Sequence, residues 1–220
     1  MFGGKAETPV VIRTMVGAGI NAAAQQSQRL TSIFTHIPGL KVVCPSNPYD
    51  AKGLLIQSIR DNDPVIFCEH KSLYGVEGEV SEESYVIPFA EANVMRDGGD
   101  VTIVAYGMMV GKAMDAAETL AKEGVECDVI DLRTLSPIDM ETVLESVENT
   151  GRLVVVDEAN PRCSIATDVS AQVAQQAFNS LKAQIEMVTA PHTPVPFASS
   201  LEDLYIPSSD SVAIAVRKTL

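Results

Sequence analysis

From residue 100 onward, short apolar runs alternate with longer amphipathic segments. Four runs are typical of buried strands: VTIVAY at 101–106, VECDVIDL at 125–132, LVVVD at 153–157 and IEMVT at 185–189. Helices are predicted between and after them, over 110–123, 136–149 and 164–178 and from residue 208, because apolar residues such as Val110, Ala113 and Leu120 recur at helical spacing. Continuous Val- and Ile-rich strands separated by helices predict a mostly parallel sheet covered by helices on both faces.

The first 70 residues show a shorter version of the same alternation. Strands are predicted at 10–12, 41–44 and 65–68, and a single helix over 22–35. A further helix begins after Asn47, which can cap it, with Pro48 at its first position. Three strands alone would leave a parallel sheet with an uncovered edge.

The segment 70–99 separates these two halves. It contains several glycines and many acidic residues, and it shows little periodicity, which indicates an extended connection. We therefore predict an α/β protein with two domains, one over 1–88 and one over 89–220.

Composition and charge exclude several classes of function. No apolar run reaches the roughly 18–20 residues that a membrane-spanning helix needs, and the N-terminus does not resemble a signal peptide. The net charge of −13 argues against a nucleic-acid partner and is compatible with a basic protein partner. The four cysteines form no CxxC pair, so we expect neither metal nor disulfide use, and a cytoplasmic location.

Candidate chemistry taken from the residues alone is sparse. The segment 15–19, MVGAG, lacks both the GxGxxG and the P-loop patterns and is interpreted mainly as a loop. His36 and His192 lie in turn-forming or Pro-rich contexts and are most simply surface residues, whereas His70 follows a strand, where parallel sheets place ligands. Asp157 and Glu158 also follow a strand, and Asp157 is expected to cap the next helix.

One long motif is more specific. Residues 25–59 read QQSQRLTSIFTHIPGLKVVCPSNPYDAKGLLIQSI, and this stretch resembles the beta subunits of thiamine-diphosphate-dependent 2-oxo acid and acetoin dehydrogenases. The resemblance extends along the chain through DPVIFCEHKSLY, VIDLRTLSPID, GRLVVVDEANPR, TPVPF and LEDLYIPS. RCSIATD and TAPHTPVPF are most similar to the acetoin dehydrogenase branch. The motifs at HIPGLKVV and VIDLRTLSP disfavour a transketolase or deoxyxylulose-phosphate synthase fragment.

The resemblance implies a fold and an activity. The fold would be a partial pyrimidine-binding, transketolase-like domain followed by a transketolase C-terminal-like domain. The activity would be oxidative cleavage of acetoin, or decarboxylation of pyruvate or another 2-oxo acid, with transfer of the acyl group to lipoamide. Implied partners are an alpha subunit, a second beta subunit and a lipoyl acyltransferase core. Implied cofactors are thiamine diphosphate shared with the alpha subunit, magnesium on the alpha subunit and potassium.

The same resemblance implies site residues and an alternative function. Gln26 occupies the place of the family's active-site histidine, and an amide cannot act as a general acid or base. The glutamate that activates the cofactor is expected upstream of Met1, so the chain is expected to be truncated and impaired on its own. The alternative function is therefore a non-catalytic assembly or docking module. A potassium site, formed largely by backbone carbonyls, is implied at Val10, Ser58, Ile59, Asp61 and Asp63.

Overall fold

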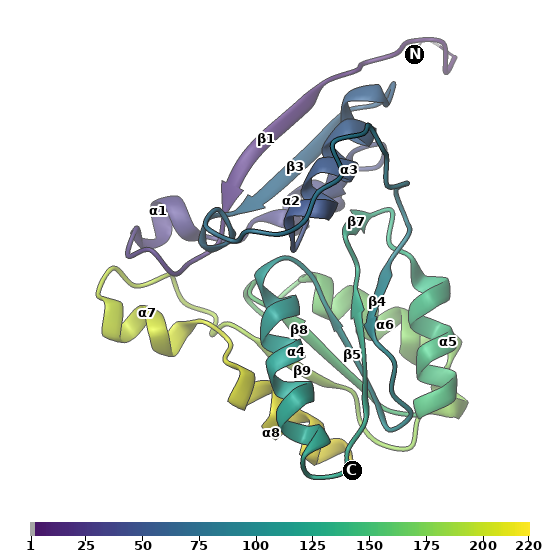
Figure 1. Cartoon of the computed structure of the whole chain (residues 1–220), viewed down its shortest axis with the longest axis vertical. Helices are drawn as coiled ribbons and strands as arrows, with labels where there is room; N and C mark the ends of the chain where they lie inside the picture. The colour runs from purple at the N-terminus through teal and green to yellow at the C-terminus, as the bar shows by residue number, and fades with distance from the viewer. Residues whose placement is uncertain (1–2) are drawn as a thin grey trace.

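The computed structural model describes residues 3–220, so Met1 and Phe2, with which the predicted first domain begins, lie outside it. Two sheets lie one above the other, with the N-terminal sheet at the top of Figure 1. The first has the strand order β1-β3-β2-β7 and the second β4-β6-β5-β8-β9. Among the described residues, we find no helix long and apolar enough to cross a membrane.

The first sheet is built from both halves of the chain. Strands β1 (Val11–Val16), β2 (Lys41–Val43) and β3 (Val65–His70) are parallel, as the sequence predicted. β7 (Thr134–Ser136) then pairs antiparallel with β2. The predicted uncovered edge therefore exists only on the β1 side, because the second half of the chain supplies the strand on the other side.

The second sheet is mostly parallel, as predicted. Strands β5 (Val101–Ala105), β6 (Cys127–Asp131), β8 (Leu153–Asp157) and β9 (Glu186–Thr189) run parallel, and β4 (Asn93–Arg96) is an antiparallel edge strand that the sequence did not reveal. Helices α4 (Met108–Ala121) and α8 (Ser209–Thr219) cover one face. Helices α5 (Met140–Thr150) and α6 (Ile165–Gln176) cover the other. This confirms the predicted α/β class.

The two sheets share one hydrophobic core. Helix α3 (Pro48–Arg60) covers one face of the first sheet, with Asn47 as its cap and Pro48 at its first position, as predicted. The other face of that sheet contributes Ile66 and Cys68 to a cluster that also contains Tyr106 and Leu132 of the second half. Since these buried residues pack together without an intervening solvent layer, the halves form one packed unit.

The predicted helix over 22–35 is wrong in one respect, because it is two short helices. α1 (Ala23–Ser27) is followed by Gln28, whose backbone is extended, and α2 (Thr31–Thr35) begins three residues after Gln28. Arg29, between the two helices, places its side chain in the interior. The Arg29 guanidinium is buried beside Glu158 and Tyr106. Because these contacts hold Arg29 in the interior, the chain does not form the continuous helix that the local sequence favoured.

The remaining elements are short and lie in loops. They are the 3-10 turns η1 (Lys71–Leu73) and η2 (Phe178–Ser180), and helix α7 (Ser199–Tyr205). α7 lies beside α1 at the left of Figure 1, although the two are far apart in the sequence. This places the Pro-rich C-terminal segment next to the motif that contains Gln26.

Candidate functional site

Glu158 is the centre of a buried polar network between the two halves of the chain. One carboxylate oxygen accepts a hydrogen bond from the Ala18 backbone N–H at 2.6 Å. The other lies 2.6 Å from Nε2 of His70 and 3.4 Å from Nη1 of Arg29. Burial acts to raise the pKa of Glu158, but the hydrogen bond from His70 and the charge of Arg29 outweigh it, so the pKa is lowered.

The hydrogen bonds of His70 fix its tautomer. Its Nδ1 accepts a hydrogen bond from the Ser72 backbone N–H at 3.2 Å, so the proton lies on Nε2, which donates to Glu158. His70 is only 2% exposed. The sequence singled out His70 and Glu158 separately, as residues at the ends of two strands, and the structure brings them together in one buried polar network.

Arg29 connects this network to the second half of the chain. Its guanidinium lies 4.6 Å above the ring of Tyr106 and donates to the Cys44 sulfur at 3.0 Å. The Tyr106 hydroxyl donates to Asp157 at 2.6 Å. Asp157 also accepts from the Ala166 backbone N–H in the first turn of α6, at 3.3 Å. The N-cap residue of α6 is nevertheless Ser164, whose hydroxyl accepts from the Thr167 N–H, so Asp157 contacts the start of the helix but does not cap it as expected.

Gly17 permits the close approach that this network needs. Its φ is +92°, and a Cβ atom there would lie 2.0 Å from Nε2 of His70. Any side chain at this position would therefore displace the imidazole from Glu158. The MVGAG segment is thus a tight structural loop in which the Ala18 amide already has a carboxylate partner.

Gln26 lies on α1, directly after this loop. Its side chain is exposed, and its backbone carbonyl accepts a hydrogen bond of 2.5 Å from Nζ of Lys71. Lys71 also donates to the Ser27 hydroxyl at 3.1 Å. The amide side chain of Gln26 therefore faces outward on a helix whose end is held by a buried cation.

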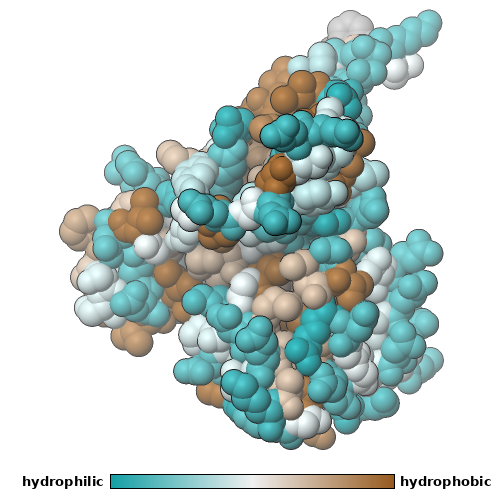
Figure 2. All heavy atoms as spheres, in the orientation of Figure 1, coloured by the Kyte–Doolittle hydropathy of each residue, from teal (hydrophilic) through white to brown (hydrophobic). Residues whose placement is uncertain are grey.

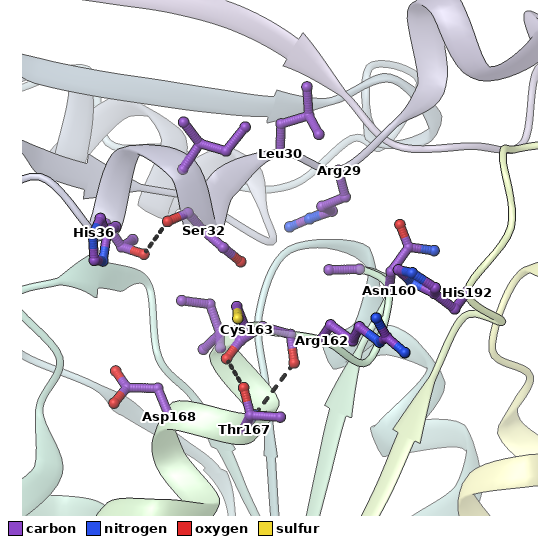
Figure 3. Close-up of a pocket in the computed structure, with 15 residues that line it drawn as sticks. Arg29, Leu30, Ser32, His36, Asn160, Arg162, Cys163, Thr167, Asp168 and His192 are labelled. Carbon is purple, nitrogen blue, oxygen red and sulfur yellow. Dashed lines mark hydrogen bonds between the residues drawn. The ribbon is translucent and has the colours of Figure 1, made fainter.

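A cleft of about 840 Å³, which Arg29 also lines, opens between α2 and the loop from β8 to α6. In Figure 3, Arg29 and Ser32 lie on one side of it and Cys163 and Thr167 on the other. His36 and His192 line it at opposite ends of the view, with Arg162 beside His192. The two imidazoles do not converge.

Of the residues predicted to bind potassium, Ser58, Ile59, Asp61 and Asp63 lie at or just after the end of α3, and Val10 precedes β1. Several of their oxygens already have partners. Nζ of Lys41 lies 2.6 Å from Asp61 and 3.1 Å from Asp63. The Val10 carbonyl accepts from the Val65 N–H and the Ser58 carbonyl from the Asp61 N–H, while Ile59 is exposed. Within residues 3–220, no group of three or more His, Cys, Asp or Glu side chains is arranged to hold a metal. Lys41 therefore already neutralises the carboxylates at this turn.

Sequence reasoning missed three residues of the buried network. Arg29 lies inside a segment predicted to be helical, and Lys71 and Glu202 lie in the family motifs DPVIFCEHKSLY and LEDLYIPS, which assigned no role to either residue. The only local signal for Lys71 was its place after His70, at the carboxyl end of a strand. Glu202 is 2% exposed and accepts from the Asn21 N–H at 2.8 Å, a contact between distant segments that no local pattern indicates.

Comparison with known proteins identifies two domain families and their order. The family "Transketolase, pyrimidine binding domain" matches residues 1–77, and "Transketolase, C-terminal domain" matches residues 90–212. A solved split-gene transketolase, described as an inactive beta4 tetramer, superposes with a TM-score of 0.81 at 24% identity. This match covers 97% of the chain and 67% of that structure, and it shows the fold.

Relatives with higher identity are beta subunits. The beta subunit of acetoin:2,6-dichlorophenolindophenol oxidoreductase from Cupriavidus necator is 76% identical over the whole chain, and that from Bacillus subtilis is 55% identical over 96% of it. The beta subunit of the pyruvate dehydrogenase E1 component from B. subtilis is 45% identical over 99% of the chain. The chain spans 65%, 62% and 67% of these three relatives, respectively. The resemblance seen in the sequence is therefore confirmed, and the chain belongs to the family of beta subunits of thiamine-diphosphate-dependent acetoin and pyruvate dehydrogenases.

Proposed function

We propose that this chain is the beta-subunit part of a thiamine-diphosphate-dependent acetoin dehydrogenase that works with an alpha subunit. The observation on which this depends is the 76% identity along all 220 residues to an acetoin oxidoreductase beta subunit, against 45% to a pyruvate dehydrogenase beta subunit. The proposed reaction cleaves acetoin and passes the acetyl group to lipoamide on an acyltransferase core. The proposed domains are residues 1–88 and 89–220.

The exposed apolar surface supports a partner subunit. Figure 2 shows hydrophobic surface over β1, at the top of the view, and over α1 and α7, at its left. Ile12 and Met15 of β1, and Ile20, Leu201 and Leu204 near α1 and α7, are each more than half exposed. Apolar residues gathered in this way are typical of protein interfaces. We assign this surface to contacts within an assembly of alpha and beta subunits.

The residues of this chain are suited to an accessory role in the reaction. Bound thiamine diphosphate supplies carbanion chemistry that cleaves the bond beside a carbonyl group. Gln26 can donate or accept a hydrogen bond and so orient a substrate carbonyl or hydroxyl, but it cannot transfer a proton near neutral pH. Glu158 and Glu202 are buried inside the chain, each with one oxygen accepting from a backbone amide, and we do not assign cofactor activation to either. We therefore assign cofactor activation, and the magnesium ion, to other parts of the assembled enzyme.

Dye reduction with the assembled subunits tests this function. The chain is mixed with an acetoin dehydrogenase alpha subunit, thiamine diphosphate and magnesium, and reduction of 2,6-dichlorophenolindophenol is followed with acetoin or pyruvate as substrate. Turnover with acetoin well above that with pyruvate is the expected result. Preference for pyruvate would contradict the substrate assignment.

The second candidate is a non-catalytic assembly module, which the amide at position 26 favours. Its signature in the same experiment is a stable complex with the alpha subunit, measured by sedimentation, together with no turnover of either substrate.

The potassium site remains a separate proposal, at Val10, Ser58, Ile59, Asp61 and Asp63. It is tested by comparing the melting temperature in potassium chloride with that in choline chloride at equal ionic strength. Stabilisation by potassium that is absent with choline supports the site. Equal melting temperatures would show that Lys41 alone neutralises this turn.

A further inference from the structure

Helix α1 is too short to hold its own conformation. It has only five residues, and a helix of this length has too few internal hydrogen bonds to offset the cost of starting it. Its entry is also unfavourable, because Asn21 and Ala23 both have a φ of +55°, a region that residues with side chains seldom adopt. Tertiary contacts must therefore hold α1 in place.

A buried carboxylate meets the start of α1. Oε2 of Glu202, on α7, accepts a hydrogen bond from the Asn21 backbone N–H at 2.8 Å. Asn21 immediately precedes Ala22, the N-cap residue of α1, and a negative charge is favourable close to the free N–H groups at the beginning of a helix. Glu202 is 2% exposed, and its Oε1 is buried without a hydrogen-bond partner among the described residues. The Glu202 carboxylate has therefore lost most of its hydration where it lies beside α1.

A buried ammonium meets the end of α1. Nζ of Lys71 donates to the Gln26 carbonyl and to the Ser27 hydroxyl, and a positive charge is favourable beside the free carbonyls at this end of a helix. Lys71 is 9% exposed. Burial lowers its pKa, and the charges of Glu202 and Glu158 offset part of this. Lys71 and Glu202 therefore complement the two ends of the same short helix.

The neighbours of Lys71 fix the loop that precedes α1. His70 holds Glu158, which accepts from the Ala18 N–H, and the Ser72 hydroxyl donates to the Ala18 carbonyl at 3.1 Å. Three consecutive residues, 70–72, thus hold both the loop and the helix of the 17–27 segment. Gln26 is one of the exposed residues of this segment, and it is the one at the position of the family's active-site histidine.

We propose that Lys71 and Glu202 are positioning residues that hold α1 at its two ends and so fix where Gln26 meets the substrate. The encounter of Gln26 with a substrate rests on the proposed function. The contacts that hold α1 belong to this chain and do not depend on it. Neither residue touches the reacting atoms. Their action passes through the position of Gln26.

Hydrogen exchange of the whole chain tests the holding of α1 without any activity. Lys71→Met removes the ammonium and keeps the length of the side chain, and Glu202→Gln removes the charge at the other end. Each change is expected to speed exchange of amides 21–28 by about tenfold or more, while amides of α4 exchange as before. Lys71→Arg, which keeps the positive charge, is expected to restore much of the protection.

Lys182→Met is the matched control. Nζ of Lys182 donates to the Thr150 carbonyl at the end of α5, at 3.0 Å, so it makes the same kind of contact far from α1. This variant is expected to leave amides 21–28 unchanged. If Lys71→Met does not fold, Glu202→Gln alone decides the outcome. Unchanged exchange of amides 21–28 in the folded variants would overturn the proposal.

Kinetics with the alpha subunit tests the consequence for Gln26. Lys71→Met and Glu202→Gln are expected to lower kcat for acetoin by about tenfold with little change in KM, because misplacement of a group that acts in the transition state affects kcat most. Faster exchange with normal kcat would overturn the positioning role. If the unmodified chain turns over no substrate, the proposed function fails, and exchange still decides whether the two residues hold α1.

Discussion

Gln26 differs from a histidine at this position in one physical property, the ability to titrate. Its side chain is exposed on α1, so a substitution there does not disturb the buried network beneath it. An amide gives no pH dependence, whereas an exposed imidazole changes charge near its ordinary pKa of about 6.5. The two side chains therefore predict different pH profiles for the same assembled enzyme.

Gln26→His is expected to give the enzyme a new pH dependence. In complex with the alpha subunit, kcat/KM for acetoin should acquire a step centred at about pH 6.5, because the new group binds and releases protons there. Rate profiles between pH 5.5 and 8.5 measure it. Gln26→Asn, which keeps the amide, is the control and should add no step. Identical profiles for Gln26→His and the unmodified chain would show that position 26 does not face the reaction.

Asp131 is a carboxylate buried between the two halves of the chain. The Ser46 hydroxyl donates to it at 2.5 Å and the Arg133 N–H at 3.0 Å. Burial raises the pKa of Asp131 to about 7, with the hydrogen bonds of Ser46 and Arg133 opposing the rise and the charge of Asp50 adding to it. In the unfolded chain its pKa is near 3.8. The folded state therefore binds this proton more tightly than the unfolded state does.

Asp131→Asn is expected to remove a pH dependence of stability. Because the folded pKa is raised, the unmodified protein keeps full stability from this group below pH 3.8 and loses it as pH rises through about 7. The free energy of unfolding, relative to that of Asp131→Asn, should fall by up to about 4 kcal/mol over this window. Urea unfolding at pH 4, 6 and 8 measures the difference. A constant difference at the three pH values would refute the raised pKa.

At the scale of elements, glycines in two helices occupy opposite environments. A Cβ atom at Gly53 of α3 would lie 2.7 Å from Cγ1 of Ile87, a buried residue of the segment that crosses this helix. At Gly111 of α4, a Cβ atom would meet nothing within 4 Å. Helix propensity alone favours alanine over glycine at both positions by about 1 kcal/mol.

Gly111→Ala is therefore expected to stabilise the protein by about 1 kcal/mol, and Gly53→Ala to destabilise it. At Gly53 the clash with Ile87 outweighs the gain in propensity, since overpacking costs about 1–3 kcal/mol. The urea midpoints of the two variants, with m-values checked for constancy, give the comparison. Stabilisation by both changes would mean that the segment around Ile87 is only loosely held against α3.

The sequence predicted the long elements and missed the short ones. The parallel strands of the second sheet and its covering helices follow from local periodicity, whereas the antiparallel edge strand β4 does not. β7 has three residues, and it is a strand only because β2 lies beside it. The break between α1 and α2 has its cause in Arg29, which is buried against residues far away in the sequence. Local pattern cannot show such contacts.

The candidate site was less accessible to sequence reasoning than the fold. Gln26 was found through the family motif, since a glutamine on a helix has no signal of its own. The roles of Lys71 and Glu202 follow from their contacts with the two ends of one short helix, α1, which lies between them. His70 was noticed for its place after a strand, and its buried partner Glu158 appears only once the two sheets are assembled.

At the scale of the whole molecule, the shared core predicts joint unfolding of the two halves. The cysteines report on this, because Cys44 and Cys68 are buried at the first sheet, Cys127 is buried in the second sheet, and Cys163 is exposed. Burial also raises the pKa of Cys68 to about 12 and that of Cys127 to about 11, so both thiols are unreactive in the folded protein.

Thiol labelling across a urea gradient is expected to show one transition. Cys163 should react at once without urea, and the three buried thiols should become reactive with the same midpoint, because the core joins both sheets. Mass spectrometry of labelled peptides assigns each thiol, and Cys163→Ser provides the background without the fast reaction. Labelling of Cys44 and Cys68 at a lower urea concentration than Cys127 would show that the first sheet unfolds independently.

The pairing of β7 with β2 also has a consequence for how the protein is made. The first sheet receives its fourth strand from residues 134–136, more than ninety positions after β2 itself. A ribosome synthesises the chain from the N-terminus, so it must translate most of the second sheet before this strand emerges. β2 therefore gains its antiparallel neighbour only after β4, β5 and β6 have been translated, and until then its unpaired side is open to pairing with other nascent chains.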